Sequence, residues 1–303
     1  MLSSSILKPL YERRTLPLLK IPLIFALVLA FGTVAWLEIH PLLTWGCYLV
    51  LGYLLMSVVT LMHDCTHTTL FATRWLNEAF GMVTMVPFLA SFTAFKEDHL
   101  EHHKYNRSPK DPDGFTMGKR SVGDFFLFYS YIFLGVILSA VYFAFIYPIK
   151  SLRGKKAWVH WAEMAVHVAV IWALFAWAGP RGLTAPILKV WLIPFVFFGY
   201  FNSMRFIAEH YGTPWNAGQM VGTRTIISNQ LTSYFWNNIN YHIGHHVYPG
   251  VPFYNLQKLH AALAGEIKES GAIVDKSYVV VYLHALLRGP ESPETTPRAK
   301  IRK

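Results

Sequence analysis

Charged residues and cysteines are scarce in this chain. Only 15% of its 303 residues are charged, 53% are hydrophobic, and the mean hydropathy is +0.32. This composition favours a membrane protein with several spans over a soluble domain. The two cysteines, Cys47 and Cys65, lie in an apolar run and between two histidines, so a disulfide framework is not supported.

Acidic residues are also few, 17 against 27 basic residues, which gives a net charge of +10. The basic residues gather beside apolar runs, at 8–20, 150–156 and 288–303. This is the positive-inside distribution of membrane proteins, and we expect no nucleic-acid partner. No small-residue cleavage site follows the first apolar run, so we expect a retained span and no signal peptide.

The histidines of this chain are clustered. Eight of its 14 histidines form three clusters: His63 and His67; His99, His102 and His103; and His242, His245 and His246. Helical residues at i, i+3 and i+4 share a face, so each cluster presents two or three imidazoles to one side. Two metal ions can use eight imidazoles and keep an open position each, whereas a structural zinc needs only about four ligands. The clusters therefore favour a dinuclear redox centre.

The three clusters resemble the histidine boxes of the membrane-bound fatty acid desaturase superfamily. HDCTH at 63–67, HLEHHKYN at 99–106 and NYHIGHHVYPGVPFYNLQKLH at 240–260 occur in the order of those boxes. The resemblance implies two iron ions, with O2 as co-substrate, in an oxidoreductase that desaturates a fatty acyl or lipid chain. Hydroxylation or ketolation of a lipid or carotenoid on the same centre is the alternative. The resemblance also implies a ninth ligand, His210, between the second and third boxes.

Six polar residues beside these histidines are candidates for orienting them. Metal-bound histidines usually donate their second N–H to a carboxylate or a carbonyl group. The candidates are Asp64, Asp98, Glu101, Asn106, Glu209 and Asn240. The segment 111–114, Asp-Pro-Asp-Gly, is instead predicted to be a turn.

The number of membrane spans follows from the requirement that all three boxes face one side. The uncharged runs are at 21–37, 41–62, 79–95, 125–149, 164–180 and 183–204, the last interrupted only by Lys189. A span needs ~20 apolar residues, so length alone permits all six. With the basic N-terminus inside, only four spans keep the boxes together: 21–37, 41–62, 160–180 and 183–206.

The predicted fold is therefore an all-α integral membrane protein, with four transmembrane helices in two hairpins, interfacial helices and a cytoplasmic histidine-rich di-metal cap. Pro87 interrupts run 79–95. Run 125–149 is assigned as an interfacial or re-entrant element, bent near Gly135. The membrane is expected to be the plasma (inner) membrane in a bacterium or the endoplasmic reticulum in a eukaryote.

One membrane domain is expected over residues 1–285, followed by a disordered basic tail over 286–303. The His-Pro-Gly-Gly motif of fused cytochrome b5 domains does not occur in the sequence. The family resemblance therefore implies a separate electron donor, which is a ferredoxin, a cytochrome b5 or a reductase docking on the basic inner face.

Two hypotheses from other classes stay open. A membrane zinc hydrolase would need only about three protein ligands and an open site, which leaves most of the boxes unused. A metal transporter would place its ligands within the spans, near the middle of the bilayer. The predicted spans instead put the boxes at span ends and in a loop.

Overall fold

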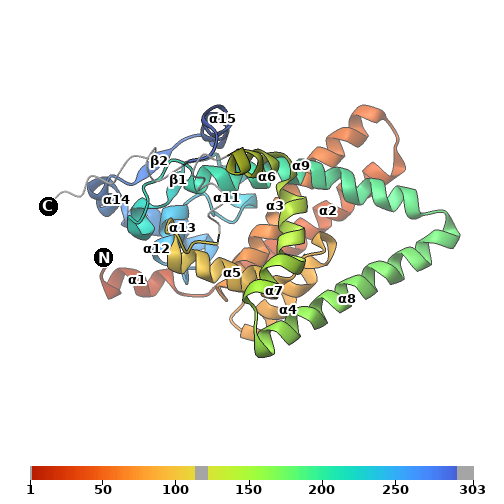
Figure 1. Ribbon diagram of the computed structural model, residues 1–303, viewed down its shortest axis with the longest axis horizontal. Helices are drawn as coiled ribbons and strands as arrows, with labels where there is room; N and C mark the ends of the chain where they lie inside the picture. Colours follow the sequence, from red (N-terminus) through yellow and green to blue (C-terminus); the bar gives the residue numbers. More distant parts are fainter. Residues whose placement is uncertain (1, 113–121, 292–303) are drawn as a thin grey trace.

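The protein is almost entirely helical in the computed structural model, which describes residues 2–112 and 122–291 (Figure 1). Its longer helices are α2 (Lys20–Leu37), α3 (Pro41–Thr66), α4 (Arg74–Met85), α5 (Phe92–Tyr105), α6 (Val122–Val141), α8 (Gly154–Ala178), α9 (Thr184–His210) and α15 (Tyr278–Arg288). Its shorter helices are α1 (Ser4–Leu10), α7 (Tyr147–Ser151), α10 (Gly218–Val221), α11 (Gln230–Phe235), α12 (His242–Val247), α13 (Leu256–Ala262) and α14 (Ala264–Ser270). Two short strands, β1 (Arg224–Ile226) and β2 (Ile273–Asp275), pair in parallel, with Thr225 opposite Val274.

Five helical segments of the described chain are long and apolar enough to cross a membrane. They are Leu16–Leu37, Pro41–Thr66, Val122–Ser151, Gly154–Arg181 and Thr184–His210. The all-α membrane class is thus confirmed, and the protein is a multi-pass membrane protein. Four of these segments correspond to the four predicted spans. The fifth contains run 125–149, and its assignment as an interfacial or re-entrant element stays a prediction.

The helix Val122–Ser151 is continuous through Gly135, where a bend was expected. Its irregular part is a π-helical turn at Tyr142–Ile146. Gly135 instead allows a close approach between α6 and α9, since a Cβ there would lie 2.9 Å from Ser203 Oγ. In Figure 1 the end of α6 and α7 run down the picture, whereas α9 runs across it.

The predicted break in run 79–95 is present. Helices α4 and α5 meet at 107°, and Pro87 lies in the short 3-10 turn between them. The first turn of α5 is held by Glu163 of α8, whose carboxylate accepts hydrogen bonds from Ser91 Oγ (2.8 Å) and Thr93 N (3.1 Å). Ser91 Oγ in turn accepts from Ala94 N at 3.1 Å, which caps the helix. A carboxylate on a long apolar helix thereby fixes the position of the helix that carries the second box.

Helix α3 lies at the centre of the long helices, packed against both α2 and α9. The contact with α9 is close because residue 52 is glycine: a Cβ there would lie 2.5 Å from Phe197 Cβ and 2.8 Å from the Pro194 carbonyl oxygen. Larger side chains are therefore excluded at this crossing. The end of α3 delivers the first box, His63 and His67, to the cap.

The cap is formed after α9 by the two strands and the short helices α10–α14, and it lies at the end of the molecule that holds α1 (Figure 1). The last described residue, Glu291, packs against the cap: it is 6% exposed, and its Oε2 lies 3.1 Å from Arg107 Nη2. Helix α15 also extends to Arg288. Residues 286–291 are thus folded, so the predicted tail does not begin at residue 286, and residues 292–303 lie outside the described part.

Labelling of single cysteines will test the four-span arrangement. We expect Lys110→Cys and Lys155→Cys to react from the same side of the membrane and Arg181→Cys from the opposite side, because run 125–149 should not cross. Both native cysteines are buried, so they give little background. Opposite-side labelling of positions 110 and 155 by an impermeant maleimide would show that Val122–Ser151 crosses and would overturn the prediction.

Candidate metal centre

Five histidines from three elements meet in a first group. His63 and His67 lie at the end of α3, His99 and His103 on α5, and His245 on α12, and each offers a ring nitrogen within 4.8 Å of the others. The Nε2 atoms of His99 and His67 are 3.0 Å apart, as are those of His103 and His99. His245 Nε2 lies 3.1 Å from His103 Nε2. Three segments far apart in the sequence thus direct their imidazoles to one point.

A second group lies beside the first. His102 of α5, His210 at the end of α9 and His246 of α12 offer ring nitrogens within 4.8 Å of one another. His242 joins them, since its Nε2 lies 3.0 Å from His210 Nε2. The rings of His103 and His246 stack at 4.1 Å between centroids, which brings the two groups together. All nine histidines predicted as ligands therefore gather in one place.

The imidazoles of the third box favour their neutral form. Burial lowers the pKa of His242, His245 and His246 well below its ordinary value, and neighbouring histidines lower it further. Neutral rings whose nitrogens face one another at 3.0 Å direct lone pairs at the same space.

Several ring nitrogens at this site are buried without a hydrogen-bond partner among the described residues. They include both nitrogens of His63 and Nε2 of His246. Buried polar atoms are normally paired, so unpaired imidazole nitrogens in two groups fit a pair of metal ions.

Some of these histidines are oriented through their Nδ1 atoms. His102 Nδ1 lies 2.8 Å from Asp111 Oδ1, and the second carboxylate oxygen of Asp111 accepts from Arg107 N at 2.7 Å. His246 Nδ1 lies 2.9 Å from Gln219 Oε1. A fixed Nδ1–H leaves Nε2 free to bind a metal. The sequence interpretation missed both partners, because Asp111 was taken as part of a turn and Gln219 lies in no motif.

The orienting residues predicted from sequence divide into two sets. Three lie at the site. Glu209 Oε2 is 3.6 Å from His242 Nε2, and Asp64 Oδ1 is 3.9 Å from His63 Nδ1. Asp98, next to His99, accepts a hydrogen bond from Tyr142 Oη at 3.0 Å. Asp64 is itself held by Asn237 Nδ2 at 2.6 Å.

The other three predicted residues form no hydrogen bond to a box histidine within the described chain. Glu101 is exposed and interacts with Tyr147. Asn106 is buried, and its amide has no hydrogen-bond partner among the residues that the structure describes. Asn240 Nδ2 donates to the Ile226 carbonyl at 2.9 Å, which ties the third box to β1.

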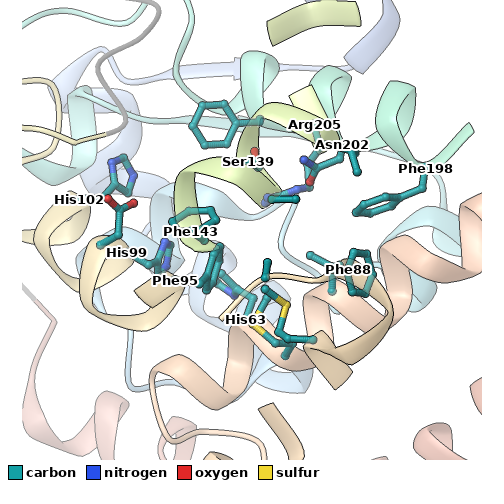
Figure 2. Close-up of a pocket in the computed structure, with 18 of the residues that line it drawn as sticks. His63, Phe88, Phe95, His99, His102, Ser139, Phe143, Phe198, Asn202 and Arg205 are labelled. Atoms are coloured by element: carbon teal, nitrogen blue, oxygen red, sulfur yellow. The ribbon is translucent and has the colours of Figure 1, made fainter. Parts of the chain in front are cut away.

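A mostly apolar cavity opens on the histidines (Figure 2). With its open mouth it contains about 890 Å³ of empty space. Five of the nine histidines line it: His63, His99, His102, His210 and His242. Away from them its walls include Val59, Met62, Met85, Phe88 and Phe198. An apolar chain inserted here would bring its C–H bonds to the metal-binding groups.

These features define a class of membrane protein: a helical domain with a histidine-rich metal centre that faces an apolar cavity. The sequence profile of the fatty acid desaturase family matches residues 39–278. The chain therefore belongs to the fatty acid desaturase family, and it is a desaturase-like oxidoreductase with a lipid or acyl substrate in a membrane setting.

Named relatives come from distant organisms. The sn-1 oleoyl-lipid 12-desaturase of Picosynechococcus sp. is 23% identical over 287 residues, which cover 75% of this chain and 78% of that protein. The sphingolipid delta(4)-desaturase/C4-monooxygenase of Homo sapiens is 28% identical, covering 77% and 69%. The chloroplastic omega-6 fatty acid desaturase of Spinacia oleracea is 23% identical, covering 66% and 49%.

The buried neutral imidazoles predict a pH-dependent stability of the metal-free protein. Below about pH 6.5, the ordinary imidazole pKa, the unfolded chain takes up protons that folded His242, His245 and His246 do not. The free energy of unfolding must then fall as the pH falls. We expect a lower thermal midpoint at pH 5.5 than at pH 8 for chelator-treated protein in detergent. An equal midpoint at both pH values would show that these rings do not stay neutral.

Proposed function

We propose that this protein is an O2-dependent di-iron oxidoreductase that desaturates a fatty acyl or lipid chain. The observation that carries the proposal is the meeting of nine histidines, in two adjoining groups, at an apolar cavity. Desaturation removes two hydrogens from neighbouring carbons and, with O2, two electrons and two protons, gives an alkene and two waters.

The two groups of histidines suit two ions. The first ion would be held by His63, His67, His99, His103 and His245, and the second by His102, His210, His242 and His246. When bound, two ferrous ions supply the electron-rich centre that reduces O2 and oxidises an unactivated C–H bond.

The chain's own residues position the substrate and the ligands. The apolar walls hold the alkyl chain and exclude water from the reacting carbon. Asp111 and Gln219 hold the Nδ1 protons of His102 and His246, so that Nε2 of each ring faces the ions. Desaturation or oxygen insertion is then decided by where the wall places the second C–H bond.

The alternatives have less support. A zinc hydrolase would leave at least half of the gathered histidines without a role. Hydroxylation on the same centre is the second candidate, because one relative's name joins a desaturase with a C4-monooxygenase. We also propose that the metal site faces the cytoplasm and receives electrons from a separate ferredoxin, cytochrome b5 or reductase.

Iron analysis and oxygen consumption of the purified protein test the proposal. We expect about two irons per chain and O2-dependent conversion of a membrane lipid. His246→Ala should lose metal and product formation while it still inserts in the membrane. His284→Ala is the matched control, because His284 is exposed on α15. Full activity without O2, or zinc in place of iron, would overturn the proposal.

The contact between Asp111 and His102 predicts that two carboxylates near the second box differ in their effect on iron affinity. Asp111→Ala should weaken iron binding about 10- to 100-fold, because the imidazole loses the partner that fixes its orientation. Glu101→Ala, which also removes a carboxylate beside the second box, should bind iron as tightly as the wild type, since Glu101 is exposed and interacts with Tyr147. Chelator competition measures both affinities, and equal losses in the two variants would contradict the assignment.

A further inference from the structure

The cavity has one polar wall in addition to its apolar ones. Asn202, Arg205 and Glu209 line it from one face of α9, as their spacing of three and four residues on a helix requires. Figure 2 shows Asn202 and Arg205 across the cavity from His63. Ser139 of α6 lies on the same side, and its hydroxyl lies 2.9 Å from Tyr131 Oη. Glu209 has a role beside His242, whereas an alkyl chain alone would give no role to the Asn202 amide in this wall.

Arg205 is the residue that indicates a ligand. It is 9% exposed, and its Nη1 donates to both carboxylate oxygens of Glu209, at 3.1 and 2.8 Å. Its Nε has no partner among the described residues, although it is buried. Buried donors in proteins are almost always paired. The guanidinium, which belongs to the cavity wall, therefore keeps donor capacity that an acceptor oxygen of the substrate would use.

The polar wall runs from the histidines toward the apolar end of the cavity, because Glu209 faces His242 and Asn202 lies one helical turn from Phe198 on α9. The Glu209 oxygen that accepts from Arg205 is 3.6 Å from His242 Nε2. In Figure 2, Phe88 and Phe198 lie at the opposite end from His102. Their rings pack at 5.2 Å between centroids. A polar group bound at Arg205 would therefore sit close to the oxidised carbon, with the alkyl chain extending toward the phenylalanines.

We propose that Arg205 and Asn202 form a subsite for a neutral oxygen group of the substrate, an amide carbonyl or a hydroxyl, that lies within a few carbons of the bond attacked. A neutral group fits because Glu209 already balances the charge of Arg205, and because the Asn202 amide can both donate and accept. A bond in the middle of a plain acyl chain would leave the guanidinium donor facing methylene groups. Polar sites built this way strongly reject ligands that lack the hydrogen-bonding group.

This inference rests on the proposed function and specifies its substrate class. The protein would act on long-chain lipids that carry an amide or hydroxyl group beside the reacting carbons, such as N-acylated long-chain amino alcohols. Mid-chain positions of ester-linked fatty acyl groups would be poor substrates.

The experiment supplies the iron-loaded full-length protein with O2 and with electrons from a ferredoxin and its reductase, and offers it two probes in nanodiscs, N-octanoyl sphinganine and distearoyl phosphatidylcholine. We expect the wild type to prefer the amide lipid and to place its product double bond or hydroxyl within a few carbons of the polar group, as read by mass spectrometry. Asn202→Leu and Arg205→Lys should each reduce the ratio of kcat/KM values for the two probes by about tenfold or more. The lysine keeps the charge beside Glu209 and removes the Nε donor.

Tyr200→Phe is the matched control, because Tyr200 is on the same helix and 48% exposed. It should keep the wild-type ratio, and all variants should keep their iron content. A wild type that prefers the phosphatidylcholine, or variants that lose activity equally on both probes, would refute the subsite and leave the proposed function standing. If a variant lost its iron, the subsite would be judged only from the wild-type protein, by its preference between the two probes and by the position of its product. Absence of iron and of any lipid product from the wild type would instead refute the proposed function.

Discussion

Nine imidazole rings share one space in this protein, where burial and crowding disfavour their charged forms. Their ring centroids lie as close as 4.1 Å, and several pairs of ring nitrogens are 3.0 Å apart. Charged rings at these separations would repel one another strongly in a medium of low polarity. Neutral rings leave their lone pairs unsatisfied, so the arrangement is stable as a metal site and costly without one.

The rest of the fold brings these rings together from separate helices. The crossing of α3 and α9 at Gly52 sets the position of the first box, because no side chain separates the two backbones there. The N-terminus of α5 is fixed by Glu163, and β1 is tied to the third box through Asn240. Each histidine segment is thus fixed by a contact outside the site, and its rings are held in place before any ligand arrives.

Local sequence patterns predicted those features of the site that depend only on local helix geometry. The spacing of His99, His102 and His103 follows from one helix face, and Pro87 marks the break before α5. The partners that orient the rings could not be predicted in the same way. Gln219 meets His246 only because the chain folds back between α9 and the third box, and Asp111 reaches His102 from a loop. The extent of the folded part was also underestimated, since the ion pair of Glu291 with Arg107 joins residues far apart in the sequence.

The contact between Glu163 and the first turn of α5 connects the bilayer to the chemistry. Helix α8 is one of the long apolar helices, and membrane-spanning helices in general tilt to match the thickness of the lipid. Since the Glu163 carboxylate is bonded to Ser91 and Thr93, a change in that tilt pulls directly on the helix that holds three of the nine imidazoles. The geometry of the second box is therefore joined, through one carboxylate, to the position of a long apolar helix.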